Sequence, residues 1–373
     1  MQVQVRKLRE ALQLLEPVIP RKTALPILHN VLLKDGQVIA GDLETFVSID
    51  LPEADLECLI PHGAVMQLLK YVPGNEMLTI EADGELTLNW DSGKSSYPRE
   101  KPKDYPQAPE LKLKTEGNMD GNVLIAALAS AASYCSSDSS RPVLSGVAIF
   151  PGENLDVAAG DGFRMAYQTI TGTFPLEQPI IIPSAAVELL RSLWQHTKPE
   201  VTLGNDLVKL VTNKRYVDIA LAEAKSGTEL LRLCFSGVTA LIKLIQGTPP
   251  DFKKLIPQEI PTTVKFFPGE LERAVKRLRA IAKDNKGVIR LVWTNDTMTV
   301  SAKSEEMGEA EGTLPVQADN PGKVGLSYQY LIEYLGGKEG VITMGVSSGT
   351  APVVLRHRAS PLVLVMPMMV QWE

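Results

Sequence analysis

The residues best suited to chemistry in this chain, its cysteines and histidines, are few and far apart in the sequence. They are Cys58, Cys135, Cys234, His29, His62, His196 and His357. Metal sites usually need closely spaced ligand pairs such as CxxC, and no such pair occurs. A catalytic histidine needs a positioned partner, which no motif supplies. The sequence therefore predicts no metal site and no cofactor, and it favours small buried cysteines in a reducing compartment.

Two further segments could be imagined in catalytic roles. One is GDGFRMA, which contains Asp161 and Arg164, and the other is PSAAVELL, which contains Ser184. The chain has no GxSxG, P-loop, HExxH or GxGxxG motif to support such a role. Ser184 is better explained as the N-cap of a helix. We therefore expect no catalytic residues and keep an enzyme only as the weaker alternative.

The composition is that of a soluble protein with more than one domain. A chain of 373 residues exceeds what one hydrophobic core usually serves, and its 44% apolar and 22% charged content is ordinary. The net charge of −6 argues against a protein that coats nucleic acid over its whole surface, but it allows a local basic face. No window approaches the roughly 20 apolar residues of a membrane helix, and the start MQVQVRKLRE does not resemble a signal peptide. We expect a cytoplasmic protein without membrane contact.

The elements that would carry functional residues follow one order, which occurs three times. Amphipathic helices are predicted at 5–15, 121–134 and 269–283, each followed by β-prone runs with polar turns between them. A second helix follows in each repeat, at 61–72, 183–195 and 327–337, and further strands follow it. One strand precedes each first helix and another connects the two halves, so each repeat is a duplicated βαβββ unit. This pattern predicts an α+β fold.

Segments rich in proline and charge separate the repeats. They are SYPREKPKDYPQAPELK before the second repeat and QGTPPDFKKLIPQEIP before the third. Domain boundaries usually fall in such segments. The sequence therefore predicts three domains, at 1–113, 114–249 and 250–373.

Several short segments, in this order, resemble the bacterial DNA polymerase III β subunit, the sliding clamp. They are TALPILHNVLL and GDLETFVSI in the first repeat, SRPVLSGVAIF and GDGFRMA in the second, PPDFKKLIP at the second boundary, and VMPM near the end. The resemblance runs from end to end. It implies three tandem DNA-clamp domains in a head-to-tail homodimer, whose six domains close into a ring with helices lining the hole. It also implies a non-catalytic processivity factor of DNA replication.

The resemblance also implies where the ring closes. The meeting edges would be the basic segment 92–100, which contains Tyr97, and a third-domain surface made of Ala280, Ile281 and the acidic segment 304–312 with Glu305, Glu306 and Glu309. Opposite charges suit this pairing. Joining sheets across the interface would remove exposed strand edges.

A ring that slides must hold duplex DNA through phosphate contacts, which carry no sequence information. The resemblance places such contacts on Lys22, Lys70 and Lys209, with Arg141 as a further candidate. The first helix of repeat one carries Arg6, Lys7 and Arg9, and that of repeat three carries Arg273, Lys276, Arg277, Arg279 and Lys283. The first helix of repeat two has no Lys or Arg, so its contact with DNA is doubtful. That helix motivates the alternative of a clamp-fold interaction scaffold that does not slide on DNA.

The resemblance finally implies a pocket for short apolar peptide motifs. Partners would be the DNA polymerase III α subunit, the clamp loader, and other polymerases or repair proteins. The pocket residues carried over are Leu144, Gly162, Phe163, Arg164, Met165, Pro250, Lys254, Leu255, Leu364, Val365, Met366, Pro367 and Met368. Flexible methionine side chains suit a surface that accepts several partners. We expect an edge strand through Val365 and the pocket beyond it, with Trp372 in an extension past the family's usual end.

Overall fold

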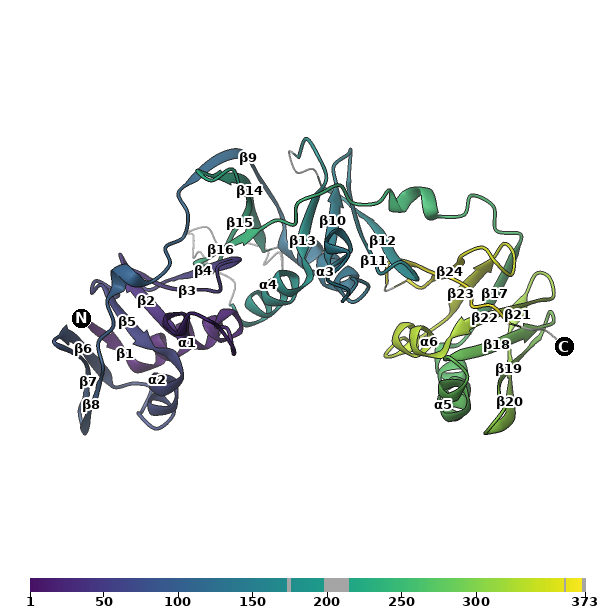
Figure 1. Cartoon of the computed structure of the whole chain (residues 1–373), viewed down its shortest axis with the longest axis horizontal. Coiled ribbons are helices and arrows are strands. Elements are labelled where there is room, and N and C mark those ends of the chain that lie inside the picture. Colours follow the sequence, from purple (N-terminus) through teal and green to yellow (C-terminus); the bar gives the residue numbers. More distant parts are fainter. Residues whose placement is uncertain (173–175, 198–214, 359, 371–373) are drawn as a thin grey trace, which may run out of the picture. The chain divides into compact units, whose positions relative to one another are not determined.

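The computed structural model describes the chain except residues 173–175, 198–214, 359 and 371–373 (Figure 1). The chain forms two compact units. Unit 1 contains residues 1–129, 150–155 and 170–246, and unit 2 contains residues 130–149, 156–169 and 247–373. The division of the chain into three domains stays a prediction.

The order βαβββ occurs twice in each third of the chain, as predicted. The first third contains β1 (Gln2–Gln4), α1 (Val5–Leu15), β2 (Asn30–Lys34), β3 (Gln37–Gly41), β4 (Thr45–Asp50), β5 (Cys58–Pro61), α2 (His62–Leu69), β6 (Met77–Asp83), β7 (Glu85–Trp90) and β8 (Gly93–Tyr97). The second contains β9 (Leu111–Asp120), α3 (Gly121–Ala132), β10 (Gly146–Phe150), β11 (Leu155–Gly160), β12 (Arg164–Ile170), β13 (Ile180–Pro183), α4 (Ser184–His196), β14 (Tyr216–Ala224), β15 (Glu229–Phe235) and β16 (Val238–Lys243). The third contains β17 (Thr262–Phe266), α5 (Pro268–Asp284), β18 (Val288–Trp293), β19 (Thr297–Ser304), β20 (Gly308–Pro315), β21 (Gln317–Ala318), β22 (Gly322–Ser327), α6 (Tyr328–Leu335), β23 (Ile342–Val346), β24 (Val353–Arg356) and β25 (Leu362–Val365). Among the residues that the structure describes, the short strand β21 is added to the predicted order.

The helices form because their apolar residues recur at helical spacing and gather on one buried face. In α5 the buried residues include Leu271, Val275 and Leu278, while charged residues occupy the exposed side. The prediction that Ser184 caps α4 is wrong. Pro183 occupies the N-cap position and makes no side-chain capping hydrogen bond, so Ser184 is the first helical residue.

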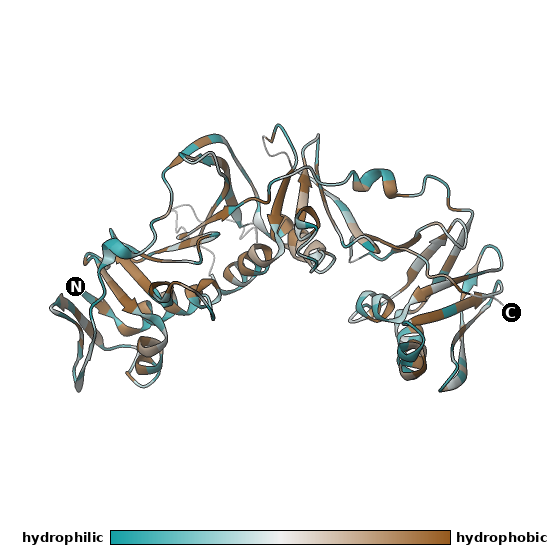
Figure 2. Cartoon of the chain, in the orientation of Figure 1, coloured by the Kyte–Doolittle hydropathy of each residue, from teal (hydrophilic) through white to brown (hydrophobic). Residues whose placement is uncertain are grey.

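Unit 1 contains two antiparallel sheets. The smaller has the order β1-β6-β7-β8, which leaves β8 at an edge. The larger has the order β5-β2-β3-β4-β16-β15-β14-β9. The pairing of β4 with β16 joins a strand of the first third to one of the second, with Thr45 opposite Ile242. Figure 2 shows hydrophobic residues concentrated on these strands, while the connecting loops are largely hydrophilic.

Unit 2 repeats this arrangement with other parts of the chain. Its larger sheet contains the order β10-β11-β12-β25-β24-β23-β17-β21, and its smaller sheet has the order β20-β19-β18-β22. Strand β25 ends at Val365 as predicted, but it is not an edge strand. It lies between β12 and β24 and pairs with both. The apolar run near the C-terminus is therefore core, because Val363 and Val365 are buried between two neighbouring strands.

Candidate partner-binding groove and DNA-facing surface

The predicted groove begins at a tight turn between β11 and β12. The Asp161 carboxylate accepts hydrogen bonds from the backbone N–H groups of Phe163 at 2.8 Å and Arg164 at 2.9 Å. Gly162 occupies the left-handed region with φ of +95°, which residues with a β-carbon rarely adopt. The turn therefore holds Phe163 outward, with 58% of its surface exposed. A large exposed aromatic ring is a common anchor for an apolar ligand.

The C-terminal segment runs beside this turn. Arg164 lies opposite Val365 in the β12–β25 pairing, and the Met366 N–H donates to the Phe163 carbonyl at 2.8 Å. Beyond the strand, the Met368 N–H donates to the Gly325 carbonyl at 2.8 Å. Met366 is 41% exposed. Two backbone hydrogen bonds thus hold the methionine segment in place and leave the Met366 side chain available.

The linker before the third repeat supplies the next residues of the groove. Phe252 is buried beneath Gly160, where an added β-carbon would lie 2.9 Å from the aromatic ring. The short helix η5 (Phe252–Leu255) begins at this ring and exposes 53% of Leu255. Lys254 extends into solvent and pairs with Asp251 at 3.0 Å. The glycine thus allows the linker to pack closely against the end of β11, and the exposed Leu255 follows Phe252 by three residues.

The predicted groove residues differ in how far they are exposed. Leu144, Pro250, Pro367 and Met368 are half-buried. Met165, Leu364 and Val365 are buried in the sheet, so their side chains are not accessible to a ligand. Their place among the residues that contact a peptide stays a prediction. The exposed apolar surface of the site comes from Phe163, Leu255 and Met366.

Arg164 is held by neighbours that the sequence did not indicate. Its guanidinium pairs with Asp161 at 3.2 Å and with Glu333 of α6, and it donates to the Ser133 carbonyl at 3.3 Å. The rings of Tyr134 and Tyr330 lie 5.1 and 4.5 Å from it. Burial acts to lower the pKa of Arg164, but the hydrogen bonds and charges of Glu333 and Asp161 outweigh burial and raise it.

These contacts assign Arg164 a supporting position, because only 12% of its side chain is exposed. Its partners Tyr134, Tyr330 and Glu333 were missed by sequence reasoning. They lie far from Arg164 in the chain, and no local pattern in one sequence connects them to it. Asp161 and Arg164, considered above in catalytic roles, are engaged with each other and with the turn.

Arg141 lies next to the groove turn. It pairs with Asp138 at 3.1 Å, and its Nη1 atom would lie 2.8 Å from a β-carbon built on Gly162. The Leu144 N–H donates to its carbonyl at 3.0 Å, which fixes the loop that carries both residues. A role for Arg141 in DNA binding stays a prediction, and its Asp138-paired guanidinium lies beside Gly162 of the turn.

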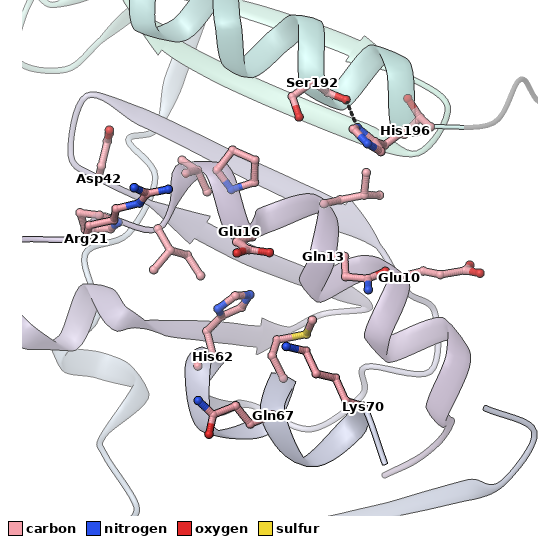
Figure 3. Close-up of a pocket in the computed structure, with 18 of the residues that line it drawn as sticks. Glu10, Gln13, Glu16, Arg21, Asp42, His62, Gln67, Lys70, Ser192 and His196 are labelled. Atoms are coloured by element: carbon pink, nitrogen blue, oxygen red, sulfur yellow. Dashed lines mark hydrogen bonds between the residues drawn. The ribbon is translucent and has the colours of Figure 1, made fainter. Parts of the chain in front are cut away.

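An open hollow of about 1470 Å³ lies in unit 1 between α1, α2 and the end of α4 (Figure 3). Lys70, a predicted DNA contact at the end of α2, lines this hollow, and so does Arg21. Lys22 follows Arg21 directly and is exposed. Lys209 lies outside the residues that the structure describes, as does Lys198. The structure thus places two of the predicted DNA contacts at or beside one helix-lined surface.

The hollow also contains histidines, but these are hydrogen-bonded to the backbone. His62 Nε2 lies 2.9 Å from the Leu12 carbonyl, and His196 Nδ1 lies 2.8 Å from the Ser192 carbonyl. Such contacts stabilise helix packing and do not orient a base toward a nucleophile. Over the described residues, no group of three or more His, Cys, Asp or Glu side chains could hold a metal ion.

Some basic residues of α1 and α5 form ion pairs or hydrogen bonds within the chain, and others are exposed to solvent. In α1, Lys7 pairs with Glu53 and Arg9 donates to the Val72 carbonyl at 2.7 Å, while Arg6 is exposed. In α5, Lys276 pairs with Glu272 at 2.7 Å. The other predicted basic residues of α5 are exposed: Arg273, Arg277, Arg279 and Lys283. Part of the predicted basic face therefore serves local ion pairs.

The two predicted closing surfaces each contain an edge strand. In unit 1, β8 is the last strand of its sheet and ends at Tyr97, which is half-buried. In unit 2, β20 is the last strand of its sheet and carries Glu309. The turn before β20 exposes Glu305 and Glu306, and α5, which packs against β20, carries the exposed Ala280 and the half-buried Ile281. Within the described part of the chain, neither outer strand edge is paired with a further strand.

Comparison with known proteins agrees with this geometry. A family model described as the DNA polymerase III beta subunit, C-terminal domain, matches residues 253–369. The beta sliding clamp of Streptomyces coelicolor is 25% identical over 350 residues, which cover 91% of this chain and 89% of that protein. That of Pseudomonas putida is 24% identical over 351 residues, covering 90% and 89%.

Solved structures show the same fold over nearly the whole chain. The DNA polymerase III subunit beta of Pseudomonas aeruginosa has a TM-score of 0.85 at 21% identity, covering 99% of this chain and 100% of that one. The DnaN sliding clamp of Bartonella birtlesii bound to griselimycin has a TM-score of 0.86 at 20% identity, covering 99% of both chains. No helix in the described part of the chain is long and apolar enough to span a bilayer. The C-terminal third of the chain thus matches the family model, and the chain as a whole is similar in sequence to bacterial β sliding clamps and shares the fold of their solved structures.

Proposed function

We propose that this protein is a DNA sliding clamp that tethers the replicative DNA polymerase to duplex DNA. The observation that carries the proposal is the likeness to beta sliding clamps over about nine tenths of the chain in sequence and nearly all of it in fold. In this role the protein supplies processivity and performs no catalysis, and it works in the cytoplasm without a cofactor.

The clamp closes as a head-to-tail homodimer of three-domain chains, with domains at 1–113, 114–249 and 250–373. Two open strand edges support this part of the proposal. Strand β8 and the segment after it carry Lys94 and Arg99, whereas β20 and the turn before it carry several glutamates. Pairing β8 of one copy with β20 of the other would add backbone hydrogen bonds and join opposite charges. A two-fold arrangement uses this pairing twice and leaves neither edge open.

Duplex DNA is held by charge alone. Lys22 and Lys70, together with Lys209 and Arg141, contact phosphates of any sequence, so the ring moves along the duplex. The exposed positions of Lys22 and Lys70 on the helix side of unit 1 support this assignment. Because the chain carries a net charge of −6, DNA phosphates are attracted to that basic face and are not attracted to the protein surface as a whole.

The groove at Phe163, Leu255 and Met366 binds short apolar peptide motifs of partner proteins. These are the DNA polymerase III α subunit, the clamp loader, and other polymerases or repair proteins. The exposure of three large apolar side chains around one fixed turn supports this part of the proposal, since such clusters mark interaction sites. Adaptable methionines allow one groove to serve several sequences.

The proposal is tested by measuring mass in solution together with polymerase run length. Sedimentation should give a dimer of twice the 40.7 kDa chain mass. Primer extension on a long template, with the clamp loader present, should give longer products when the protein is added. A dimer that binds partner peptides but never lengthens the products would instead indicate an interaction scaffold. A stable monomer would overturn the ring.

A further inference from the structure

The frame of the groove occurs a second time, in unit 1. The turn between β3 and β4 has the same construction as the turn between β11 and β12. The Asp42 carboxylate accepts hydrogen bonds from the N–H groups of Glu44 at 3.0 Å and Thr45 at 2.7 Å, as Asp161 does for Phe163 and Arg164. Leu43 has a φ of +79°, and Gly162 in the equivalent position has +95°. Leu43 adopts this unfavourable conformation despite its β-carbon, so the frame is strongly imposed.

The strand pairing beside each turn is also the same. Thr45 lies opposite Ile242, as Arg164 lies opposite Val365. The Lys243 N–H then donates to the Glu44 carbonyl at 2.9 Å, whereas the Met366 N–H donates to the Phe163 carbonyl at 2.8 Å. Glu44 and Lys243 of unit 1 thus occupy the positions that correspond to Phe163 and Met366 of unit 2.

An aromatic residue from a linker supports both turns. Tyr105 is buried, and its hydroxyl accepts a hydrogen bond from the Gly41 N–H at 3.3 Å. Phe252 is buried beneath Gly160 in the same way. Three residues after each aromatic, the chain exposes Ala108 in unit 1 and Leu255 in unit 2.

The two copies therefore share a backbone frame and differ in the side chains that face solvent. Phe163, Leu255 and Met366 expose apolar surface in unit 2. Their counterparts in unit 1 are Glu44, Ala108 and Lys243, listed here in the same order. Glu44 and Lys243 form an ion pair at 3.0 Å, with side chains 62% and 42% exposed.

We infer that unit 1 contains a second groove frame, which Glu44, Lys243 and Ala108 keep from binding an apolar peptide. An apolar peptide laid on the ion pair would remove both charges from water, and the loss of hydration outweighs what the pair's own attraction gains. The small Ala108 side chain would also offer little contact area. Leu43, the chain neighbour of Glu44 in the turn, is 46% exposed, so some apolar surface is already present there.

This inference rests on the proposed function of the groove. It predicts that unit 1 will bind an apolar peptide once its three side chains are replaced by those found at the corresponding positions of unit 2. The triple variant Glu44→Phe, Ala108→Leu, Lys243→Met should bind two apolar peptides per chain, whereas the parent binds one. The probe is a fluorescein-labelled octapeptide with leucine and phenylalanine among polar residues, chosen from a small panel as the tightest ligand of the parent protein. Titration calorimetry gives the stoichiometry. The control variant Glu44→Gln, Lys243→Gln removes the ion pair without adding apolar surface and should still bind one peptide.

The reciprocal exchange tests the same inference without relying on the first variant to fold. Phe163→Glu, Leu255→Ala, Met366→Lys should weaken peptide binding at least 100-fold while the protein keeps its dimer mass. A stoichiometry of one for a folded triple variant in unit 1 would overturn the inference and leave the groove proposal standing. Unchanged binding by the Phe163→Glu, Leu255→Ala, Met366→Lys variant would overturn the groove proposal as well as the inference. A parent protein that binds none of the peptides would overturn the groove proposal, and this inference with it.

Discussion

The guanidinium of Arg164 forms an ion pair with Glu333 between the rings of Tyr134 and Tyr330. Arg164 begins β12 and Glu333 lies in α6, so the pair connects two elements that are 169 residues apart in the chain. Arg164 also lies opposite Val365, directly before the exposed Met366. The position of the methionine segment therefore depends on this cluster, although Arg164 itself is largely hidden from a ligand.

Replacing Arg164 by Gln should destabilise unit 2 by about 2 to 4 kcal/mol, because Glu333 and Asp161 lose their buried cationic partner. Arg164→Lys should recover only part of this stability, since an ammonium group does not stack between two rings or make several parallel hydrogen bonds. The measurement is urea unfolding followed by circular dichroism. Arg191→Gln breaks the exposed pair with Glu188 and is the matched control, expected to change stability by about 0.5 kcal/mol or less. Equal effects of the Arg164 and Arg191 variants would contradict the supporting role of Arg164.

Replacing Met366 and Met368 by Ala should weaken binding of an apolar partner peptide by roughly thirty-fold or more, since residues in such pockets contribute on the order of 2 kcal/mol each. Fluorescence anisotropy measures the affinity, and sedimentation of the same protein should still show a dimer. Met77→Ala changes an exposed methionine of unit 1 and should leave affinity unchanged. Normal peptide binding by the double variant, or loss of the dimer, would mean that these methionines belong to core or interface.

Replacing Lys22, Lys70 and Lys209 together by Ala should weaken association with DNA equally for all sequences. Each lost phosphate contact lowers the slope of log affinity against log salt by about 0.9, so the slope should flatten by up to about 3. Binding to linear duplex over a range of salt concentrations measures this slope. Lys225→Ala removes an exposed cation that pairs with Glu110, and it serves as the control. An unchanged slope in the triple variant would favour a scaffold that does not slide.

Reversing charge at Glu305 and Glu306 to Lys should shift the dimer toward monomer, with a larger effect at low salt because screening is then weak. Analytical ultracentrifugation at nanomolar protein concentration reports the shift. Glu153→Lys changes an exposed glutamate elsewhere and should not alter the mass. If the doubly reversed protein stayed dimeric in low salt, the ring would close through other surfaces.

Two thiols should make stability fall at alkaline pH. Burial raises the pKa of Cys58 to about 11 and that of Cys135 to about 12, from an ordinary value near 9. Between pH 9 and these raised values the native state binds more protons than the unfolded state. The contribution of the thiols to the free energy of unfolding is therefore fully present below pH 9 and declines as the pH rises above 9. Each thiol can contribute a loss of at most about 1.4 kcal/mol per pH unit.

Urea unfolding at pH 8 and pH 10.5 measures this decline, and Cys135→Ala should reduce it. The native thiols should also react slowly with iodoacetamide at pH 8, since the thiolate is the reactive form. Fast labelling of Cys58 or Cys135 in the folded protein would show that the two thiols are not shielded.

Local patterns in the sequence were enough to predict the repeating order of elements. The helix over 5–15, the strand that ends at Val365 and the βαβββ order all follow from periodicity and turn residues within short windows. Such windows contain the information because a helix or a hairpin forms between near neighbours. The same local patterns led to two wrong predictions. Ser184 was predicted as the N-cap of α4, but the adjacent Pro183 occupies that position. Strand β25 was predicted as an edge strand, but it pairs on both sides, because strand partners come from distant parts of the chain.

Contacts between distant segments could not be read from spacing. The cluster around Arg164, the hydrogen bond between Gly41 and Tyr105, and the approach of Phe163 to Met366 each join residues separated by at least 30 positions. Burial and the closing of sheets bring them together, and neither leaves a local signal in one sequence. The same is true of the second groove frame. The two frames share a Gly-Asp pair and a linker aromatic, but these common residues show their equivalence only once both turns, both strand pairs and both aromatics are seen in place.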